Sequence, residues 1–363
     1  MTATIRGWLL AAAALLLAAV GVVVSTGPAH AATPATFDVA GVDLHDGMML
    51  QQGGTYYLYG TEYGCGFNWL THGTPWCGFG VSTATSLAGP WSVPVLLFSP
   101  SAVDPWTGTT WTVECGGTGA GCFNARMIQR TWGPGDGVWI LWFSAPADYT
   151  RSTANAYYAM GCNGPAGPCG YVAPNGSVHK PSLRVCGGNG DIGFAQPVGA
   201  APYLLCTNAN QTLSEEQLGF WGVDGTGVGS TALAGLPDVE SPGAYLDAGG
   251  TWVLTYSDPN CGYCDGDPTG YATASSPAGP WTAPVEAGFG APPAGRRDLS
   301  ATSCGGQART VSILGGQAYE GIDLWTGSAN ETAAGLHFEP LTYRGGAPPP
   351  GTLWQPFTPW ECT

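Results

Sequence analysis

Five polar positions in this sequence could do chemistry together, because each falls just before or at the start of a predicted β-strand. Carboxyl side chains gathered at one place can divide the work of acid–base catalysis, since a neighbouring negative charge raises the pKa of one carboxyl and keeps its proton. Five segments in the same register predict a single polar site. The positions are His45 with Asp46, Asn124 with Arg126, Asp191, Glu240 and Gln307.

Each of these residues also has a structural explanation. Asp46 precedes Gly47 and so fits a turn, and Glu240 could accept backbone hydrogen bonds. Gln307 could tie strands together, and His45 fits either a ligand contact or the core. Turn and core chemistry explain single residues, but they do not explain polar groups at the start of five strands.

The elements that must position these residues are predicted hairpins. After each polar position comes a short apolar strand, and about ten residues later a second strand rich in β-branched and aromatic residues. Turns such as Gln52-Gly53-Gly54 and Ala248-Gly249-Gly250 join the two strands. The first strands are predicted at 48–50, 127–129, 192–195, 243–246 and 310–314. The second strands are predicted at 56–61, 138–145, 202–207, 252–257 and 318–325.

The hairpins belong to a degenerate repeat. Thr-Ser-Leu-Ala-Gly-Pro-Trp at 85–91 closes the first unit, and Ser-Pro-Ala-Gly-Pro-Trp at 276–281 closes the fourth. Repeats made of strands alone, about 50–80 residues apart, are typical of radial blades. Helical periodicity is weak throughout, and 214–220 is expected to form a helical turn at most. We therefore predict an all-β fold, a five-bladed β-propeller formed by residues 32–363 as one domain; a two-sheet sandwich is the alternative, and it does not explain the repeat.

The first 31 residues, 1–31, are predicted to be a secretory signal peptide. Arg6 precedes an apolar run at 9–24, and Ala29-His30-Ala31 fits a cleavage site. The run is short for a membrane span and no stop-transfer charges follow it, although an uncleaved anchor is the alternative. No later segment is expected to cross a membrane. The mature chain is therefore expected to be secreted and extracellular, with a monomer as the default state.

Charge and composition limit the partners. The formal net charge is −15, and cleavage, which removes Arg6 and no acidic residue, makes it −16. A surface this acidic repels nucleic acid, and no basic stripe offsets it. Charged residues make up only 10% of a chain that contains 15 Trp, which excludes a disordered protein. A neutral substrate fits this composition better.

The 12 cysteines predict disulfide bonds, because the chain is expected to be exported. Zinc binding is the alternative for Cys261 and Cys264, but neither a second pair at finger spacing nor a nearby histidine accompanies them. Proximity in the sequence suggests the pairs Cys65/Cys77, Cys115/Cys122, Cys162/Cys169, Cys186/Cys206 and Cys261/Cys264, which leaves Cys304 with Cys362.

The spacing of carboxylates and strand aromatics resembles that of the family 43 glycoside hydrolases, over residues 37–345. The resemblance implies a propeller enzyme in which Asp46 is the general base, Asp191 orients the acid and tunes its pKa, and Glu240 is the general acid. Glu240 also begins a Glu-Ser-Pro element like that of the family. The matching intervals are ten residues from Asp46 to Tyr56, twelve from Asp191 to Tyr203 and twelve from Glu240 to Trp252.

The same resemblance implies cleavage of a glycosidic bond with inversion. One carboxylic acid protonates the leaving oxygen and a base activates water, the two groups standing about 6.5–9.5 Å apart. Some family members hold a Ca²⁺ in the channel, but the sequence shows no convincing oxygen cage, so neither a metal nor another cofactor is expected. The residues expected to bind the sugar are His45, Asn124, Arg126 and Gln307, with Trp69, Trp76, Trp106 and Trp111 stacking at the rim of the pocket.

Within the family, the exo-β-1,3-galactanase branch is the most similar. His45, the Glu-Ser-Pro element and Ser-Cys-Gly-Gly-Gln at 303–307 carry this resemblance. In that branch a fifth-blade Gln is the base and the first-blade Asp is missing, whereas this chain has both Gln307 and Asp46. Asn124-Ala125-Arg126-Met127 stands where the branch has a Glu before Arg-Pro. The expected substrates are galactan or arabinogalactan, or the side chains of arabinan or xylan.

Three other functions stay open. A catalytically inactive propeller would keep the pocket and bind carbohydrate without cleaving it, as the departure at 124–127 allows. A retaining fructan-acting hydrolase needs elements that are absent from the expected places, because Glu114-Cys115 lies too early and Arg297-Asp298-Leu299 lacks a proline. A purely structural surface protein gives no reason for acids at the starts of the strands.

Overall fold

A computed structural model describes residues 34–71, 73–116, 121–145, 156–170, 178–188, 190–284, 298–345, 356–360 and 362. They belong to one compact unit, Pro34–Thr363. The predicted signal peptide, residues 1–31, lies outside the described residues. None of the helices in the described part of the chain has the length and apolar character needed to span a bilayer.

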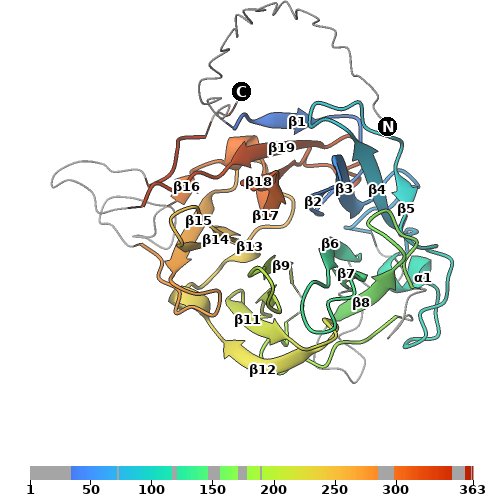
Figure 1. Cartoon of the computed structure of the whole chain (residues 1–363). Helices are drawn as coiled ribbons and strands as arrows, with labels where there is room; N and C mark the ends of the chain where they lie inside the picture. Colours follow the sequence, from blue (N-terminus) through green and yellow to red (C-terminus); the bar gives the residue numbers. More distant parts are fainter. Residues whose placement is uncertain are drawn as a thin grey trace, which may run out of the picture. The chain divides into compact units, whose positions relative to one another are not determined.

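Five antiparallel sheets surround a central axis, which confirms the predicted five-bladed β-propeller (Figure 1). The first blade contains β2 (Met49–Gln52), β3 (Thr55–Thr61), β4 (Phe79–Ala84) and β5 (Val95–Leu96). The second contains β6 (Phe123–Gln129), β7 (Trp139–Ser144) and β8 (Tyr157–Cys162). The third contains β9 (Ile192–Ala195), β10 (Tyr203–Thr207), β11 (Leu213–Leu218) and β12 (Gly225–Ser230). The fourth contains β13 (Glu240–Leu246), β14 (Trp252–Ser257), β15 (Thr269–Ala274) and β16 (Asp298–Ser300).

The fifth blade closes the ring, because its outermost strand comes from the other end of the sequence. It contains β17 (Gln307–Leu314), β18 (Gln317–Leu324), β19 (Gly335–Pro340) and β1 (Phe37–Val39). Phe37 is the register partner of Phe338 in the antiparallel β1–β19 pair, and the two rings stack with centroids 4.8 Å apart. This pairing joins the first described strand to the last and leaves no gap in the ring.

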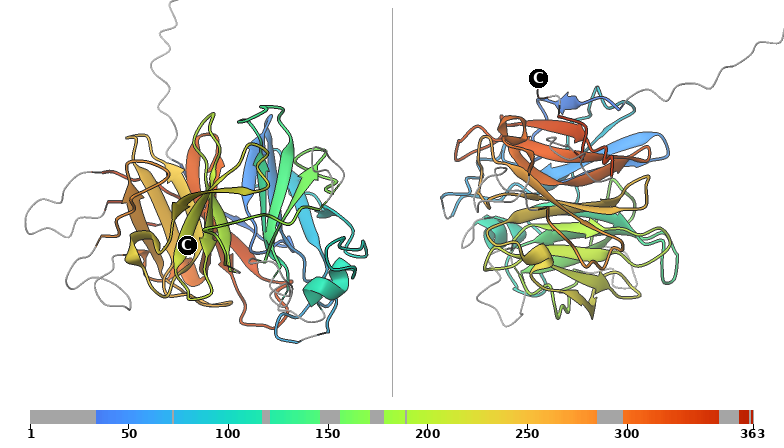
Figure 2. Two further views of the ribbon diagram at one scale, coloured as in Figure 1. Left: turned by 90° about the horizontal axis from the view of Figure 1, so that it is seen from below. Right: turned by 90° about the vertical axis from the view of Figure 1, so that its left-hand side faces the viewer.

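The innermost strands are the first strand of each hairpin, namely β2, β6, β9, β13 and β17 (Figure 1). Figure 2 shows the blades from the side, with their strands running along the axis. All ten predicted strands are present within a few residues of their expected bounds, and β9 and β14 match them at both ends. The alternation of hairpins with glycine-rich turns is thus enough to locate the two inner strands of every blade.

One element differs from the expectation, because 214–220 contributes to a strand, β11, and not to a helical turn. Two consecutive glutamates make this segment look solvent-facing, yet Glu215 and Glu216 are both fully buried. Glu216 accepts the N–H groups of Val185 and Cys186, and Glu215 accepts Trp281 Nε1 from the next blade. Acids that are buried by such tertiary contacts give no local signal. The short helices α1 (Trp111–Gly116), η2 (Leu233–Gly235) and η3 (Ser303–Gly305) were also not expected.

The repeated segments at 85–91 and 276–281 form the same turn in the first and fourth blades. The Gly89 N–H donates to Ser86 O at 3.0 Å, and the Gly279 N–H donates to Ser276 O at 3.0 Å. Both turns directly follow the third strand of their blade. The sequence repeat therefore reflects equivalent positions in two blades.

All six predicted cysteine pairs form disulfide bonds, and no free cysteine is found in the described part of the chain. Cys261 and Cys264, the residues of the zinc alternative, are paired with each other in this structure. Five of the bonds staple residues close in sequence, and Cys304–Cys362 ties the fifth blade to the C-terminal segment.

Candidate active site

The predicted polar positions meet at one end of the axis, where the inner strands begin. The Asn124 N–H donates to Asp46 Oδ1 at 3.0 Å, and Asn124 Nδ2 donates to Asp191 Oδ1 at 2.7 Å. Gln307 Nε2 donates to Glu240 Oε1 at 2.8 Å. These contacts link the first three blades to one another and the fourth blade to the fifth.

Ser241 joins the two halves of this cluster. It follows Glu240 on β13, and its hydroxyl donates to Asp191 Oδ2. Its φ of 55°, like 56° at Asp46 and 64° at Asn124, lies in the left-handed region. That conformation costs a non-glycine residue about 1–3 kcal/mol and persists only where the surrounding structure enforces it. Three such residues in one cluster are typical of a functional site.

Bulges at the starts of three inner strands aim the side chains of the cluster. A bulge inserts a residue into one strand, bends it and turns a side chain away from the regular alternation, and it is common next to active sites. The register shifts lie between Phe123 and Arg126 in β6, between Glu240 and Gly243 in β13 and between Ala308 and Thr310 in β17.

Exposure divides the seven predicted site residues into two groups. The three carboxylates Asp46, Asp191 and Glu240 keep part of their surface exposed. The four residues expected to bind the sugar are buried, with exposures of 0% for His45, 1% for Asn124, 1% for Arg126 and 7% for Gln307. The carboxylates are thus the members of this set that solvent or a ligand can reach.

The carboxyl group of Glu240 has the character of a proton donor. Burial, reinforced by the negative charges of Asp191 and Asp267, raises the pKa of Glu240 to about 8. Its Oε1 accepts the Cys261 N–H and Gln307 Nε2, each at 2.8 Å, and these bonds oppose the rise. Because its pKa lies above 7, Glu240 keeps its proton at neutral pH, as a general acid must.

Asp46 contacts a hydroxyl group and a further acidic residue. Its Oδ2 accepts the Thr61 hydroxyl at 3.0 Å, and its N–H donates to Asp323 Oδ2 at 3.1 Å. Burial and the neighbouring Asp323 raise the pKa of Asp46 well above its usual range, while the Arg126 guanidinium lowers it. Asp323 was not predicted, although an aspartate in the middle of an apolar strand, 318–325, was a signal that it serves the site.

Arg126 occupies the axis itself and holds several blades together. Its Nη1 donates to Asp46 O at 2.5 Å, its Nε to Ile192 O at 2.8 Å and its Nη2 to Arg309 O at 3.0 Å. Nη2 also donates to Asn124 Oδ1 at 2.8 Å. These partners come from the first, second, third and fifth blades. The buried guanidinium therefore presents no exposed donor to a sugar hydroxyl in this structure, contrary to the expectation from sequence.

His45 is likewise enclosed. Its ring packs against Tyr63 and Trp325, with centroids 5.4 and 5.7 Å away. Its Nε2 lies 3.4 Å from Asp43 Oδ1 and its Nδ1 lies 3.9 Å from Asp323 Oδ1. A ring without exposed surface cannot touch a sugar in this structure, so the geometry gives His45 a place between two acids behind Asp46.

Gln307 has its amide group satisfied by the protein. The amide oxygen accepts the Tyr263 N–H at 3.2 Å and Trp325 Nε1 at 2.9 Å. The amide nitrogen donates to Glu240 Oε1 and to Cys261 O. Gln307 therefore connects the acid to the loop that follows β14, and little of its amide remains to hold a water molecule.

Two tyrosines that the sequence analysis did not single out cover the cluster. Tyr263, with φ 64°, lies between the paired Cys261 and Cys264 and shares a hydrogen bond of 2.7 Å with the Tyr63 hydroxyl. Burial raises the pKa of Tyr263 well above its usual range, and Asp46 and Asp191 add to this. The Tyr263 ring stacks on Trp69 at 4.1 Å with an interplanar angle of 2°. Its flanking cysteines and glycine were the available sequence signal.

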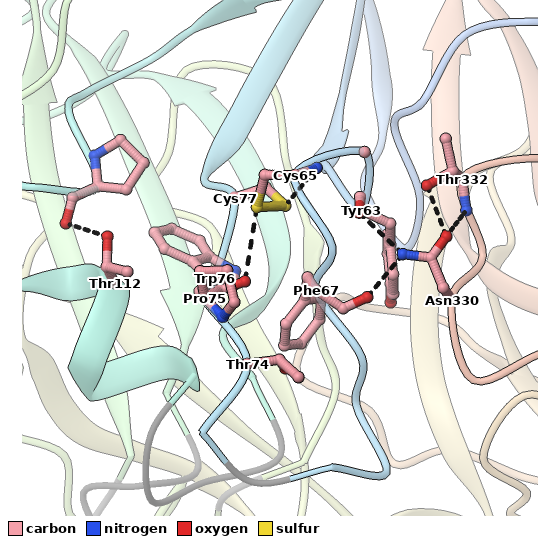
Figure 3. The surroundings of a disulfide bond; sticks show 12 residues. Tyr63, Cys65, Phe67, Thr74, Pro75, Trp76, Cys77, Thr112, Asn330 and Thr332 are labelled. Carbon is pink, nitrogen blue, oxygen red and sulfur yellow. Dashed lines mark hydrogen bonds between the residues drawn. A yellow bond between two sulfur atoms is a disulfide. The ribbon is translucent and has the colours of Figure 1, made fainter.

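The loop that carries Trp69 is held in place from two sides (Figure 3). The Cys65–Cys77 disulfide closes it, and the Cys65 N–H donates to Cys77 Sγ at 3.1 Å. Asn330 Nδ2, from the fifth blade, donates to Tyr63 O at 2.9 Å and to Phe67 O at 2.8 Å. Contacts from both the first and the fifth blade therefore hold this loop in place.

The tryptophans expected at the rim fall into two pairs. Trp69 is partly exposed and Trp106 is 55% exposed, so both have surface available for a ligand. Trp76 and Trp111 are each only 1% exposed, and the expectation that they stack on sugars is wrong. They pack edge to face on Phe79 at 4.8 Å and on Tyr158 at 5.0 Å, in the core between the first two blades.

Neither the axis nor the fifth blade offers a set of metal ligands among the described residues. The carbonyl oxygens of Asp46, Ile192 and Arg309, which a cation on the axis would need, already accept hydrogen bonds from Arg126. Cys304, Glu339 and Cys362 lie within 4.8 Å of one another, but the two cysteines are joined as a disulfide. The residues present do not fit a channel Ca²⁺.

Comparison with known proteins finds no matching protein-family model and no matching curated sequence. Solved structures do match. An exo-β-1,3-galactanase from Phanerochaete chrysosporium has 20% identity and a TM-score of 0.61, over 85% of this chain and 62% of that one. An exo-β-1,3-galactanase from Clostridium thermocellum has 16% identity and a TM-score of 0.59, over 84% and 60%. The arabinanase Arb43A from Bacillus subtilis has 14% identity and a TM-score of 0.51, over 82% and 94%.

The chain shares with these structures the five-bladed propeller fold of family 43 glycoside hydrolases, so the resemblance expected from sequence is confirmed at the level of the fold. It spans less than two thirds of the length of the Phanerochaete protein. At this level of identity, the function has to be argued from the chain's own residues.

Proposed function

We propose that this protein is a secreted glycoside hydrolase that cleaves a neutral polysaccharide or oligosaccharide with inversion, using Glu240 as the general acid. The observation that carries the proposal is a partly exposed glutamic acid whose pKa is raised to about 8, beside a second carboxylate, Asp191, at the start of an inner strand. A protonated carboxyl next to an ionisable one is the arrangement that glycosidic cleavage requires.

Asp46 is the proposed base. Asp46 as a residue is partly exposed, and its two carboxyl oxygens are fixed by the Asn124 N–H and the Thr61 hydroxyl. Gln307, the other candidate for the base, is 7% exposed and has both ends of its amide bonded to the protein. This difference favours Asp46, and it gives Gln307 the task of orienting Glu240.

Asp191 is proposed to orient and tune the acid. It accepts the hydroxyl of Ser241, which is adjacent to Glu240, and its charge contributes to the raised pKa of Glu240. Asn124 then holds Asp191 in place through its side-chain amide, 2.7 Å away. In this proposal Asn124, Arg126 and His45 position the carboxylates, and Tyr263 and Trp69 provide the aromatic surface for the sugar.

The substrate class proposed is a plant-type polysaccharide: galactan or arabinogalactan, or the side chains of arabinan or xylan. The matched structures include enzymes named for β-1,3-galactan and for arabinan. A chain this acidic favours an uncharged glycan over an acidic one, because like charges repel.

The test is hydrolysis of a panel that contains β-1,3-galactan, arabinogalactan, arabinan and arabinoxylan, with NMR of the product anomer at early times. Glu240→Gln is expected to lower kcat by at least about a hundredfold. Glu62→Gln is the control, since Glu62 is also a half-buried acid with a pKa raised to about 7, but the charge that adds to this rise is that of Asp43 and not that of Asp191.

Release of sugar with inversion by the wild type and the control, but not by Glu240→Gln, supports the proposal. Retention of the anomeric configuration contradicts the inverting mechanism. Binding of a panel glycan without any release contradicts the enzyme and favours the catalytically inactive carbohydrate-binding propeller.

A further inference from the structure

A hollow lies at the end of the axis opposite the carboxylate cluster, where the inner strands end. It has a volume of about 550 Å³, within the range of small-molecule sites. Residues from all five blades line it, and none of them belongs to the carboxylate cluster. Among the lining residues are Gln51, Gln129, Trp139, Gln196 and Tyr245.

The two ends of the axis are separated by close contact between inner strands. A Cβ atom on Gly193 would lie 1.9 Å from Pro242 O, and one on Gly243 would lie 2.3 Å from Val311 N. Glycine at these positions allows the third, fourth and fifth blades to touch. These contacts and the Arg126 guanidinium lie between the two ends of the axis, and none of the residues of the carboxylate cluster lines the hollow, so we treat the hollow as a separate site.

The lining of the hollow is uncharged apart from one aspartate. Asp247 directs its Oδ1 into its own turn, where it accepts the Thr251 N–H at 2.5 Å. Four of the other polar side chains are amides, and three of them come from consecutive blades, five residues after a cluster residue of the same blade: Gln51 after Asp46, Gln129 after Asn124 and Gln196 after Asp191. In each of these three blades, the same interval of five residues separates the residue of the carboxylate cluster from the glutamine that lines the hollow.

The chemistry of the lining selects a ligand that is neutral and polar on one side and apolar on the other. An amide both donates and accepts, as a sugar hydroxyl does. The partly exposed Trp139 ring offers a face on which the C–H groups of a sugar pack. The buried Tyr245 hydroxyl has no hydrogen-bond partner among the described residues, and such a group gains from a polar ligand. Gln129 Nε2 also donates to Gly137 O at 3.2 Å, whereas a purely apolar ligand would leave the amides of Gln51 and Gln196 without a partner, which is costly.

We propose that this hollow is a second carbohydrate-binding site, which takes one or two residues of a neutral sugar and acts independently of the carboxylate end. Its ligand is expected to stack on Trp139 and to bond the amides of Gln51, Gln129 and Gln196. Such a site would hold a glycan on the face of the propeller that carries no catalytic acid.

The test is ¹⁹F NMR of protein labelled with 5-fluorotryptophan, in which the Trp139 signal is assigned with Trp139→Phe. Galactose, arabinose, xylose and their methyl glycosides are titrated to about 50 mM, a range that detects weak binding. At least one sugar is expected to shift the Trp139 signal saturably, in the wild type and equally in Glu240→Gln.

Two variants check the assignment. Gln51→Leu/Gln129→Leu removes two amides, and Ala248→Trp, at an exposed lining position, fills the hollow without touching the core. Each is expected to weaken the Trp139 response by at least about tenfold, with the rate of hydrolysis unchanged. Since Ala248→Trp is on the surface, it remains informative if the double variant fails to fold.

The proposal is overturned if no sugar shifts the Trp139 signal, if the shift survives Ala248→Trp, or if an apolar probe such as benzene shifts it and sugars do not. Hydrolysis is measured in the same samples. Loss of the distal site with hydrolysis intact, or the reverse, therefore separates failure of this proposal from failure of the proposed function.

Discussion

Replacing Arg126 with methionine removes the guanidinium from the axis and leaves three carbonyl groups, those of Asp46, Ile192 and Arg309, without that donor. Each buried group left unpaired costs about 1–3 kcal/mol, so three groups give at least about 3 kcal/mol and up to about 9 kcal/mol. We therefore expect the free energy of unfolding to fall by about 4 kcal/mol.

The assay is urea unfolding followed by tryptophan fluorescence, with disulfides intact. With an m-value of about 3 kcal/mol/M, the midpoint is expected to fall by about 1–2 M. The variant should also shift the acidic limb of hydrolysis to higher pH, since Arg126 lowers the pKa of Asp46 and its loss lets that pKa rise. Arg130→Met is the matched control: Arg130 is equally buried, but it pairs with Asp136 outside the cluster.

The alternative is that Arg126 contacts the sugar, and it predicts a different effect of the substitution on stability and on KM. A residue that binds substrate would raise KM when replaced and leave the unfolding midpoint where it was. An unchanged midpoint with an unchanged pH profile in Arg126→Met would refute the cross-axis role argued here. A smaller midpoint shift in Arg130→Met, without a change in the pH profile, is expected to accompany the result if the reasoning is correct.

Three further results are expected. Because Glu240 acts in its protonated form and has a pKa of about 8, kcat/KM should fall as pH rises through about 8; a level profile to about pH 10 would exclude Glu240 as the acid. Burial raises the pKa of Glu320 from 4.5 to about 8, so its contribution to stability is complete below pH 4.5 and is lost as pH rises towards 8, by about 5 kcal/mol. Thermal unfolding at pH 5 and pH 8 should show the protein to be more stable at pH 5, with a smaller difference in Glu320→Gln, and an equal difference in the variant would argue against this source. Tyr263→Ala removes the stack on Trp69 and should raise KM by about tenfold with little change in kcat, whereas Tyr263→Phe keeps the ring and should raise it much less; equal effects of the two substitutions would mean that the hydroxyl and not the stack matters.

Local sequence patterns were sufficient to predict the strands of the blades but not which of their polar side chains are buried. Strands such as β9 and β14 can be predicted because each has a few β-branched or aromatic residues between two turns, and this information is contained in the segment itself. The buried glutamates of β11 show the limit, because Glu215 and Glu216 are stabilised in the strand by partners that include residues 30 or more positions away.

For the site, the sequence indicated which polar residues lie at the starts of the inner strands but not which of them are buried. Asp46, Asp191 and Glu240 were found from their position before strands, which is a local property. Bulges and packing between blades decide whether a side chain such as His45 or Arg126 is exposed at the site or buried behind it. Neither feature changes the pattern of apolar and polar residues within one strand, so neither can be predicted from that pattern. Tyr263 was missed for a related reason, since its importance comes from a contact with Trp69, on a loop of another blade.

The pairing of β1 with β19 has a consequence for biosynthesis. Phe37 and Phe338 are partners across nearly the whole chain, and closing a loop of this length costs about 5 kcal/mol in chain entropy. As the protein is synthesised, β1 emerges first and has to wait for every other blade before its partner exists. Until then the ring is open, and the edges of the first and last blades are unpaired and prone to join other chains. Chains that terminate before residue 335 would keep four blades but lack β19, so β1 would have no partner. We expect such chains to aggregate or to be degraded and not to retain partial function.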